Sequence, residues 1–183
     1  MIDVKFVGKV EDSGVDMNLV YIPAGFGVEE FWMSETPVTV RQWCEVMGLP
    51  CGEEEANLPK TEVNIEDITE FLQRLTQNTG KNFRLPTEIE WCRAVGEEPK
   101  KLEDYAVFGT NQITAVKTKL PNEYGLYGMR GLVYEWVSDW ENYVARGGSW
   151  FDYRLFARAV YRSYGHPANR FDFIGFRVVH LKP

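Results

Sequence analysis

Helical periodicity stops after Pro99, and this break constrains the fold more than any other feature of the sequence. The second half of the chain is rich in Gly, Tyr and Trp, and its β candidates, residues 144–146 and 176–180, are brief and far apart. Long irregular connections are uncommon inside a compact domain and are often functional. A length of 183 residues suits one domain with one core. We therefore expect a single α+β domain, residues 1–183, with few helices, short strands and much irregular structure.

Three helices are expected, all before that break. The clearest covers residues 65–78, where apolar residues recur at i, i+3, i+4 and i+7 and form one stripe. Asn64 can cap its first turn and Gly80 supplies a stop. A second helix begins at the capping box of Thr87 and Glu90. The third helix is expected at residues 39–47. Two strands are expected before it, at residues 19–23 and 31–34.

Charge and cysteine content argue against several classes of function. The formal net charge of -7 and the pI of about 5.0 disfavour binding to nucleic acid, which requires a basic surface. The three cysteines and two histidines lack the spacing of a disulfide framework or a zinc cluster. These residues are Cys44, Cys51, Cys92, His166 and His180. A reducing or redox-neutral setting fits them best.

The sequence shows no sign of a membrane segment. No stretch approaches the roughly 18 apolar residues of a membrane span. The N-terminal sequence has no apolar run of signal-peptide length. We therefore expect no membrane insertion, and a phage particle or the cytoplasm rather than independent secretion. The sequence does not indicate an oligomeric state.

Four stretches between positions 35 and 177 carry a resemblance to a known family. They are ETPVT at 35–39, RLPTEIEW at 84–91, the run from NEYGLYGM to Trp136 at 122–136, and RGGSW at 146–150 with GFR at 175–177. In residues, order and spacing they resemble the formylglycine-generating-enzyme domain family. The resemblance implies a variant of the C-type lectin fold, which agrees with the α+β pattern above.

Most residues of these motifs have structural explanations. Gly147 and Gly148 allow a tight turn of the backbone. Glu88 and Glu135 can neutralise internal arginines. Three tryptophans would fill the space that sparse secondary structure leaves: Trp91, Trp136 and Trp150.

The resemblance also bears on catalysis. For formylglycine-generating members, the resemblance implies a pair of copper-binding cysteines in the C-terminal part of the chain. The last cysteine of this sequence is Cys92. Relatives in the ergothioneine pathway would need a histidine-rich domain for iron, and this chain has two histidines. At the family's calcium loop, Leu132 stands where an oxygen ligand is expected, which leaves calcium binding open. We predict no enzyme activity, no catalytic residue, no metal site and no cofactor.

Residues 151–173, hereafter the 151–173 segment, differ in composition from the rest of the chain. Seven of these 23 residues are aromatic, about 30% against 14% for the whole chain. The aromatics follow a period of neither 2 nor 3.6, so they cannot all point inward. Exposed aromatic side chains beside small polar ones are typical of antibody-like combining surfaces. In such a surface, polar side chains such as Asp152, Asp172, Ser163 and His166 would select polar partners.

Residues 151–179 also lack five residue types, Lys, Glu, Gln, Met and Trp. These types make up 43 of the 183 residues, so about seven would be expected in this window. Their codons end in a purine, whereas every type present can be written with a codon that ends in a pyrimidine. Random replacement of the two adenines of an Asn codon produces this set. It resembles the variable proteins of diversity-generating retroelements, in which a reverse transcriptase copies a template with errors at adenines into the end of a C-type-lectin-like gene.

The fixed positions of that family's variable region also match. They are RGGSW, Ala-Arg, Arg, Pro, Arg and Gly-Phe-Arg, found here at 146–150, 157–158, 162, 167, 170 and 175–177. The resemblance then assigns thirteen variable, ligand-binding positions: Phe151, Asp152, Tyr153, Leu155, Phe156, Tyr161, Ser163, Tyr164, Gly165, His166, Phe171, Asp172 and Phe173. Three residues fit either class: Arg154, Ala168 and Asn169.

Arg158, Arg162 and Arg170 would belong to the scaffold. We expect Arg158 and Arg170 to be buried, with guanidinium groups bonded to backbone carbonyls or to carboxylates such as Glu88 or Glu135.

Two functions follow from this reading. The first is a ligand-binding protein whose C-terminal lectin-fold surface is diversified to recognise varied macromolecular targets, expected to be proteins. The alternative is a formylglycine-generating-enzyme-like or lectin-like domain that is not diversified and has a catalytic or carbohydrate-binding role. The Glu-Pro-Asn and Gln-Pro-Asp tripeptides of calcium-dependent lectins are absent from the sequence.

Overall fold

Two of the three helices begin at the capping residue that the sequence predicts, Asn64 or Thr87, and the third is capped by Thr39, the first residue of its predicted range. The computed structural model describes residues 7–9, 15–138 and 144–180. Its helices are α1 (Val40–Met47), α2 (Ile65–Thr79) and α3 (Glu88–Ala94), with a short 3-10 helix at Leu102–Asp104. Thr39, Asn64 and Thr87 each form a reciprocal capping box with the third residue of the helix. Gly48 and Gly80 end α1 and α2 in the left-handed conformation.

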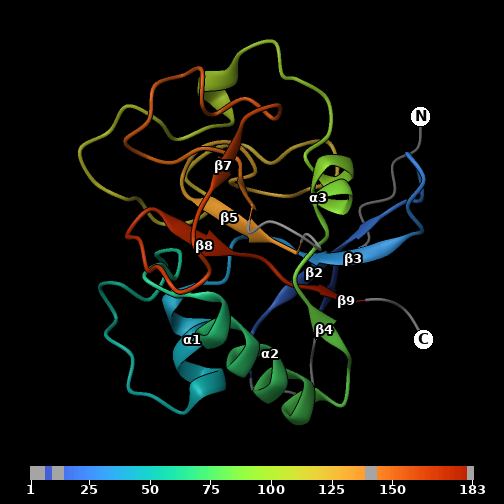
Figure 1. The fold of residues 1–183 in the computed structure, drawn as a ribbon, viewed down its shortest axis with the longest axis vertical. Coiled ribbons are helices and arrows are strands. Elements are labelled where there is room, and N and C mark those ends of the chain that lie inside the picture. Colours follow the sequence, from blue (N-terminus) through green and yellow to red (C-terminus); the bar gives the residue numbers. More distant parts are fainter. Residues whose placement is uncertain (1–6, 10–14, 139–143, 181–183) are drawn as a thin grey trace.

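Two sheets carry the rest of the described chain (Figure 1). The first is antiparallel, with the strand order β1-β2-β3-β9-β4. The second has the order β7-β6-β5-β8, in which only β5 and β8 are parallel. The strands are β1 (Val7–Lys9), β2 (Asn18–Ile22), β3 (Phe31–Ser34), β4 (Phe83–Arg84), β5 (Tyr134–Val137), β6 (Val144–Arg146), β7 (Arg162–Tyr164), β8 (Ile174–Phe176) and β9 (Val179–His180). The predicted α+β class is confirmed.

The predicted strand at 176–180 is wrong as a single element. The chain leaves the second sheet after β8 and enters the first sheet as β9, with Arg177 and Val178 between the two strands. Arg177 is fully buried there, and its guanidinium donates to the Glu135 carboxylate and to the carbonyl oxygens of Ser34 and Glu35. A buried guanidinium needs hydrogen-bond acceptors on several sides. The chain changes sheet at Arg177, where such acceptors surround its side chain.

Strand β5 was not predicted from the sequence. All four residues of this strand are buried, so it lacks the alternation of apolar and polar residues by which a half-exposed strand is recognised. The strand lies between β6 and β8. It therefore joins the two strands from which the 151–173 segment departs and to which it returns.

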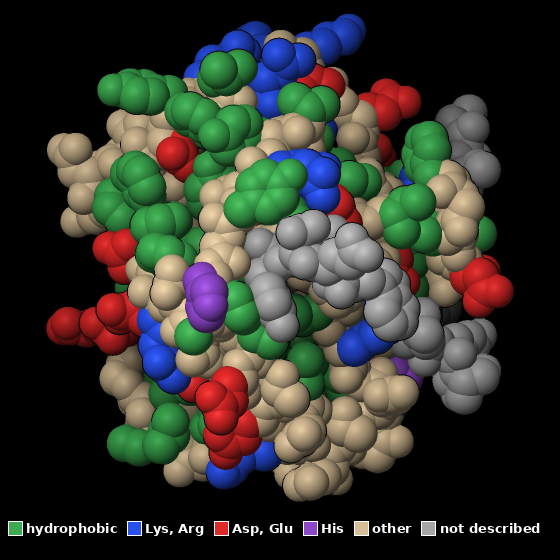
Figure 2. Space-filling model, in the orientation of Figure 1, with side chains coloured by type: hydrophobic (Ala, Val, Ile, Leu, Met, Phe, Trp, Pro, Cys, Tyr) green, Lys and Arg blue, Asp and Glu red, His purple; other side chains and the backbone are tan. Residues whose placement is uncertain are grey.

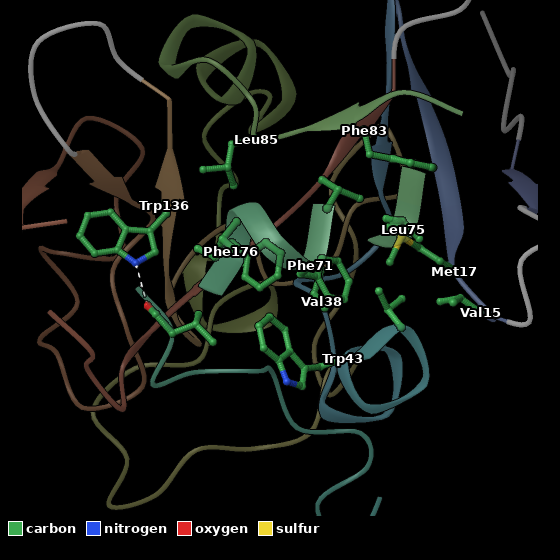
Figure 3. Packing of buried hydrophobic residues seen from close by; sticks show 14 of the residues in the cluster. Val15, Met17, Val38, Trp43, Phe71, Leu75, Phe83, Leu85, Trp136 and Phe176 are labelled. Atoms are coloured by element: carbon green, nitrogen blue, oxygen red, sulfur yellow. Dashed lines mark hydrogen bonds between the residues drawn. The ribbon is translucent and has the colours of Figure 1, made fainter. Parts of the chain in front are cut away.

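An aromatic core fixes the position of β8 (Figure 3). The rings of Trp43 in α1 and Phe71 in α2 are stacked with centroids 5.2 Å apart. Phe176 of β8 meets both rings edge-on, at 6.2 and 5.3 Å. Trp136 of β5 lies in the same cluster and donates its indole hydrogen to the Val63 carbonyl at 3.4 Å. The helices and the second sheet thus form one packed unit beneath the 151–173 segment.

Candidate ligand-binding surface

The 151–173 segment connects β6 to β8 and contributes the edge strand β7 to the same sheet. In Figure 1 the part of the segment around β7 lies above β5, away from α1 and α2, whereas the later part returns towards the helices. There the Ile65 amide at the start of α2 donates to the Pro167 carbonyl. Because β6 and β8 both pair with β5, the two ends of the segment are held close together by a buried strand. This is the arrangement of a loop presented by a rigid support.

The segment is entered through the predicted glycine turn. Gly147 and Gly148 have φ angles of 105° and 78°, in the region that favours glycine. A Cβ at Gly148 would lie 2.5 Å from the carbonyl oxygen of Phe156. The turn therefore requires glycine both for its backbone angle and for its packing.

None of the thirteen predicted ligand-binding side chains is buried. Six are exposed: Phe151, Tyr153, Leu155, Tyr164, His166 and Asp172. Seven are half-buried: Asp152, Phe156, Tyr161, Ser163, Gly165, Phe171 and Phe173. Their role in ligand binding stays a prediction, but the structure leaves all thirteen positions at least partly accessible.

The half-buried aromatics form two small clusters. Phe173 lies between Phe151 and Phe171, with both pairs of ring centroids 5.0 Å apart. Phe156 and Tyr161 pack edge-on at 4.5 Å. Tyr161, Phe171 and Phe173 also pack against the core cluster that contains Trp43 and Trp136. These rings support the surface from below, whereas Tyr153, Leu155 and Tyr164 project from it.

Two of the thirteen positions have internal roles. The Asp152 carboxylate accepts hydrogen bonds from the Ser149 amide at 3.0 Å and the Ser149 hydroxyl at 2.7 Å. It therefore closes a turn and is not the free polar contact that the sequence analysis expected. A Cβ at Gly165 would lie 2.6 Å from Cη2 of the buried Trp136, so this position has no room for a side chain.

The expectation that Arg158 and Arg170 are buried is wrong. Their side chains are 50% and 51% exposed. Each arginine of the segment instead pairs with a carboxylate outside it, because a long arginine stem can lie along the surface and still reach an acidic neighbour. The pairs are Arg154–Glu103 at 2.9 Å, Arg158–Glu98 at 3.7 Å, Arg162–Glu88 at 2.8 Å and Arg170–Asp67 at 2.8 Å.

Two buried arginines flank the segment. Arg146 precedes it and donates to the Tyr161 carbonyl at 2.9 Å, while its Nε lies 3.4 Å from Glu88. Arg177 follows it and pairs with Glu135 at 2.7 Å. Burial raises the pKa of the Glu135 carboxyl, and the Arg177 guanidinium opposes that effect. The prediction that Glu88 and Glu135 neutralise internal arginines is confirmed.

Sequence reasoning missed Val160, whose side chain is 77% exposed. It lies in the same segment, between the matched positions 157–158 and 162. Valine has a codon, GTC, that arises from the Asn codon AAC when both adenines are replaced. The codon pattern could therefore have identified this residue. Nine large hydrophobic side chains are exposed among the described residues, and five lie in this segment: Phe151, Tyr153, Leu155, Val160 and Tyr164.

Hydrophobic side chains gather accordingly on one part of the surface. Figure 2 shows many of them in the upper half of the view, over the region where β7 is labelled in Figure 1. Blue and red side chains are interspersed with them, as expected from the arginine–carboxylate pairs. The surface is therefore apolar and aromatic, with arginines that are paired within the molecule.

A cavity of about 910 Å³ lies beside the end of α3, outside the 151–173 segment. Its two arginines are engaged by the protein itself. Arg130 pairs with Glu98 at 2.7 Å, and Arg93 donates to the Tyr124 hydroxyl and to the Pro23 carbonyl. Their partners leave them less available to an anionic ligand.

The residues at the family's calcium loop do not fit calcium. Leu132 is buried and apolar. Both oxygens of Glu135 are occupied, one by Arg177 and the other by the Trp91 indole at 2.7 Å. Within residues 7–9, 15–138 and 144–180, no group of three or more His, Cys, Asp or Glu side chains could hold a metal ion.

None of the helices in the described part of the chain is long and apolar enough to cross a membrane.

Part of the chain is similar in sequence to a curated protein kinase. It is 34% identical to serine/threonine-protein kinase pkn1 of Chlamydia pneumoniae, over 51% of this chain and 20% of the kinase. The pkn1 protein of Chlamydia caviae matches over the same shares at 33% identity. The match thus spans about a fifth of the length of these curated relatives.

Several solved structures share the fold at low sequence identity. Treponema denticola variable protein 1 has a TM-score of 0.83 at 22% identity, over 97% of this chain and 99% of that chain. PvdO from Pseudomonas aeruginosa has a TM-score of 0.77 at 20% identity, over 98% and 99%. The Major Tropism Determinant U1 variant has a TM-score of 0.59 at 14% identity, over 97% and 55%. The predicted fold, a C-type lectin-like fold of the formylglycine-generating-enzyme type, is confirmed.

One family model covers most of the chain. It describes the sulfatase-modifying factor enzyme 1-like domain and matches residues 22–182. The match contains all four motif stretches and the whole 151–173 segment. The chain therefore belongs to the sulfatase-modifying factor enzyme 1-like domain family.

Proposed function

We propose that this protein binds macromolecular ligands without catalysis, and that the 151–173 segment is its binding surface. One observation carries the proposal. Five of the nine exposed large hydrophobic side chains among the described residues lie in this one segment. Exposed apolar side chains that gather in one place mark interaction sites, whereas isolated ones need no explanation.

The chemistry of the surface favours a protein as the ligand. Tyrosine and phenylalanine provide rigid contact area at low entropic cost, and such anchors dominate the energetics of protein interfaces. Tyr153, Leu155 and Tyr164 project from a floor of packed rings. The arginines of the segment are paired with carboxylates, so the surface offers little unbalanced positive charge to a nucleic acid.

The proposal includes diversification of the surface by a retroelement. Residues 151–179 contain only types that a pyrimidine-ended codon can encode, and the exposed Val160 extends this pattern. The same fold occurs in a protein named variable protein 1 and in variants of the Major Tropism Determinant. The paired arginines and the glycine turn would hold the backbone while the exposed side chains change.

The DNA beside the gene tests diversification. We expect a reverse-transcriptase gene and a near-copy of the sequence encoding residues 151–177, differing from it at adenines of the copy. The codons for Tyr153, Leu155, Val160 and Tyr164 should be among those that differ. A copy that differs equally at all four bases would disprove adenine-directed change, as would a neighbourhood with no copy.

Binding is tested with two matched display libraries. In the first, the codons of Tyr153, Leu155, Val160 and Tyr164 are replaced by NNC; in the second, the codons of Phe26, Leu49, Ile89 and Leu120, which are also exposed, are replaced in the same way. Both libraries are selected on yeast against lysozyme and against serum albumin. We expect specific binders from the first library only. Equal yields from the two libraries would mean that the 151–173 segment is no better a binding surface than the rest of the molecule.

A further inference from the structure

The cavity beside the end of α3 has two walls that are joined by one side chain. One wall follows the end of α3, and the other is the turn that contains Asn122. The Asn122 side-chain amide donates to the carbonyl oxygens of Ala94 and Val95, and its oxygen accepts from the backbone amides of Tyr124 and Leu126. The cavity is therefore preformed, and its volume of about 910 Å³ is typical of small-molecule sites.

The lining of this cavity offers apolar surface to a ligand. Val95, Leu126 and Met129 line it and belong to the buried core. Phe26 and Leu120 also line it, although they are 80% and 53% exposed. They are two of the four exposed large hydrophobic side chains that the described residues contain outside the 151–173 segment. A ligand that covers them removes apolar surface from water, which favours binding.

Acidic side chains outnumber basic ones in the same lining. The carboxylates of Glu97, Glu98 and Glu123 stand against the guanidinium groups of Arg93 and Arg130, which leaves one net negative charge. Glu98 is paired with Arg130 at 2.7 Å. Within the described part of the chain, neither Glu97 nor Glu123 forms an ion pair. A ligand with one positive charge would balance the lining.

Glu123 has a fixed position in this lining. Its Oε1 accepts a hydrogen bond from the Glu97 amide at 2.8 Å. Gly96 leaves room for the carboxylate, because a Cβ at that position would lie 2.2 Å from the same oxygen. Oε2 accepts no hydrogen bond from the described residues, and the side chain is exposed. One oxygen of Glu123 thus holds the carboxylate in place, and the other is available to a ligand.

We propose that this cavity binds a small aromatic monocation, such as an aryl amidine or an aryl amine. The cationic group donates to the free oxygen of Glu123, in a charge-assisted hydrogen bond that is stronger than a neutral one. The aromatic body packs on the apolar lining, where the rings of Tyr105 and Tyr124 favour a nearby cation. Arg93 shows this preference within the molecule, because its guanidinium carbon lies 5.1 Å from the centroid of the Tyr124 ring and 5.6 Å from that of Phe26.

Cys92 provides a reporter for this site. Its thiol is exposed and lines the cavity, whereas Cys51 is half-exposed and lies outside it. A ligand in the cavity therefore shields Cys92 from alkylation and leaves Cys51 unchanged. None of the residues of the 151–173 segment, all of which the structure describes, lines the cavity, so the inference does not depend on the proposed binding function.

Benzamidine is the probe, and benzamide and benzoate, which have the same shape but are neutral and anionic, are its controls. We expect benzamidine to bind the full chain with a Kd of about 1 mM, measured by isothermal titration calorimetry. At about four times Kd, it should slow the alkylation of Cys92 by iodoacetamide about fivefold, with no change at Cys51. The controls should bind about fivefold more weakly or not at all. Equal binding of either control, or bound benzamidine that leaves Cys92 fully reactive, would overturn the proposal.

A matched pair of variants tests the role of the carboxylate. Glu123→Gln removes the charge but keeps an oxygen that can accept the Glu97 amide, and it should weaken benzamidine binding about two- to fivefold. The control is Glu54→Gln, at an exposed position outside the cavity, which should leave Kd unchanged. An unchanged Kd in Glu123→Gln would contradict the proposal. An equal loss in Glu54→Gln would do so too, because the attraction would then come from the acidic chain as a whole.

Discussion

Arg170 and Asp67 form a two-point ion pair between the 151–173 segment and the first turn of α2. The Nε and Nη2 atoms of Arg170 donate to the two carboxylate oxygens of Asp67 at 2.8 and 2.9 Å. The same carboxylate accepts a hydrogen bond from the Asn64 amide in the capping box of α2. One acidic side chain therefore stabilises the start of a helix and holds the proposed binding segment against it.

Replacing Arg170 with alanine should lower Tm only slightly. The pair is half-exposed, and exposed ion pairs contribute little because water and salt screen them. We expect a fall of about 2–4 °C, measured by circular dichroism during heating. Arg158→Ala, which removes a guanidinium 3.7 Å from Glu98, should change Tm less. A large loss of stability in Arg170→Ala would show that this arginine has the buried, structural role that the sequence suggested.

The effect of Arg170→Ala should depend on pH. The hydrogen bonds from Arg170 are the main reason that the pKa of Asp67 is lowered in the folded protein. A carboxyl group of this kind stabilises the fold above its unfolded pKa of about 3.9, and the contribution is lost as pH falls through the lower, folded value. The difference in Tm between wild type and Arg170→Ala should therefore shrink from about pH 7 to about pH 3. A constant difference would contradict this linkage.

Arg177→Met should be far more damaging. It leaves the fully buried carboxylate of Glu135 without its cation, which costs about 3–5 kcal/mol. Burial raises the pKa of Glu135, and without Arg177 only the hydrogen bond from the Trp91 indole opposes that rise. The variant should thus lose stability as pH increases above the unfolded pKa of about 4.3, because the carboxyl group ionises in the unfolded chain but not in the folded one.

Urea unfolding at about pH 5 and about pH 8 measures this dependence. The control is the double variant Arg177→Met with Glu135→Gln, which removes the buried charge. It should recover part of the lost stability at the higher pH and show little dependence on pH. Equal stability of the single variant at both pH values would rule out an unpaired carboxylate as the cause.

Gly165→Ala should destabilise the protein by about 1–3 kcal/mol, because the added methyl group would press on the buried ring of Trp136. Chemical unfolding measures the change. Ser163→Ala, two residues before Gly165, serves as the control. That substitution adds no atom and should change stability by less than about 1 kcal/mol. An unaffected Gly165→Ala protein would return position 165 to the set of positions free to vary.

Tyr153 and Phe171 should respond differently to the same substitution. Tyr153 is 80% exposed, so Tyr153→Asn should change stability by less than about 0.5 kcal/mol. Phe171 packs against Phe173 and the core, so Phe171→Asn should cost about 1–3 kcal/mol. Thermal or urea unfolding of both variants distinguishes a displayed ring from a supporting one. Similar large losses in both would show that the segment is part of the core.

Local patterns were sufficient to predict the helices. A capping box and a terminal glycine lie within a few residues of the helix end that they stabilise, so Asn64 and Gly80 mark α2 in the sequence as clearly as in the structure. The strands β3 and β6 were also predicted from local patterns, with the bounds that the structure shows. The motif stretches between 35 and 177 then identified the fold, because their order reflects how distant parts of the chain pack together.

Features that depend on distant neighbours could not be predicted in this way. Arg158, Arg170 and the buried Arg177 are indistinguishable as residue types, and only the folded chain shows which of them is surrounded by protein. The exclusion of a side chain at Gly165 depends on Trp136, which lies in another strand.

The sequence by itself determined the class of fold, the helices with their caps, and the segment whose composition sets it apart. The tertiary structure decided which side chains of that segment are displayed. Tyr153 and Phe171 are both aromatic, yet one projects into solvent and the other packs on the core. The physical reason is that the exposure of a side chain depends on which other parts of the chain pack against it. Here the sheet that contains β5 and β8 holds the segment, and the residues of the segment alone do not show which of them will face that sheet.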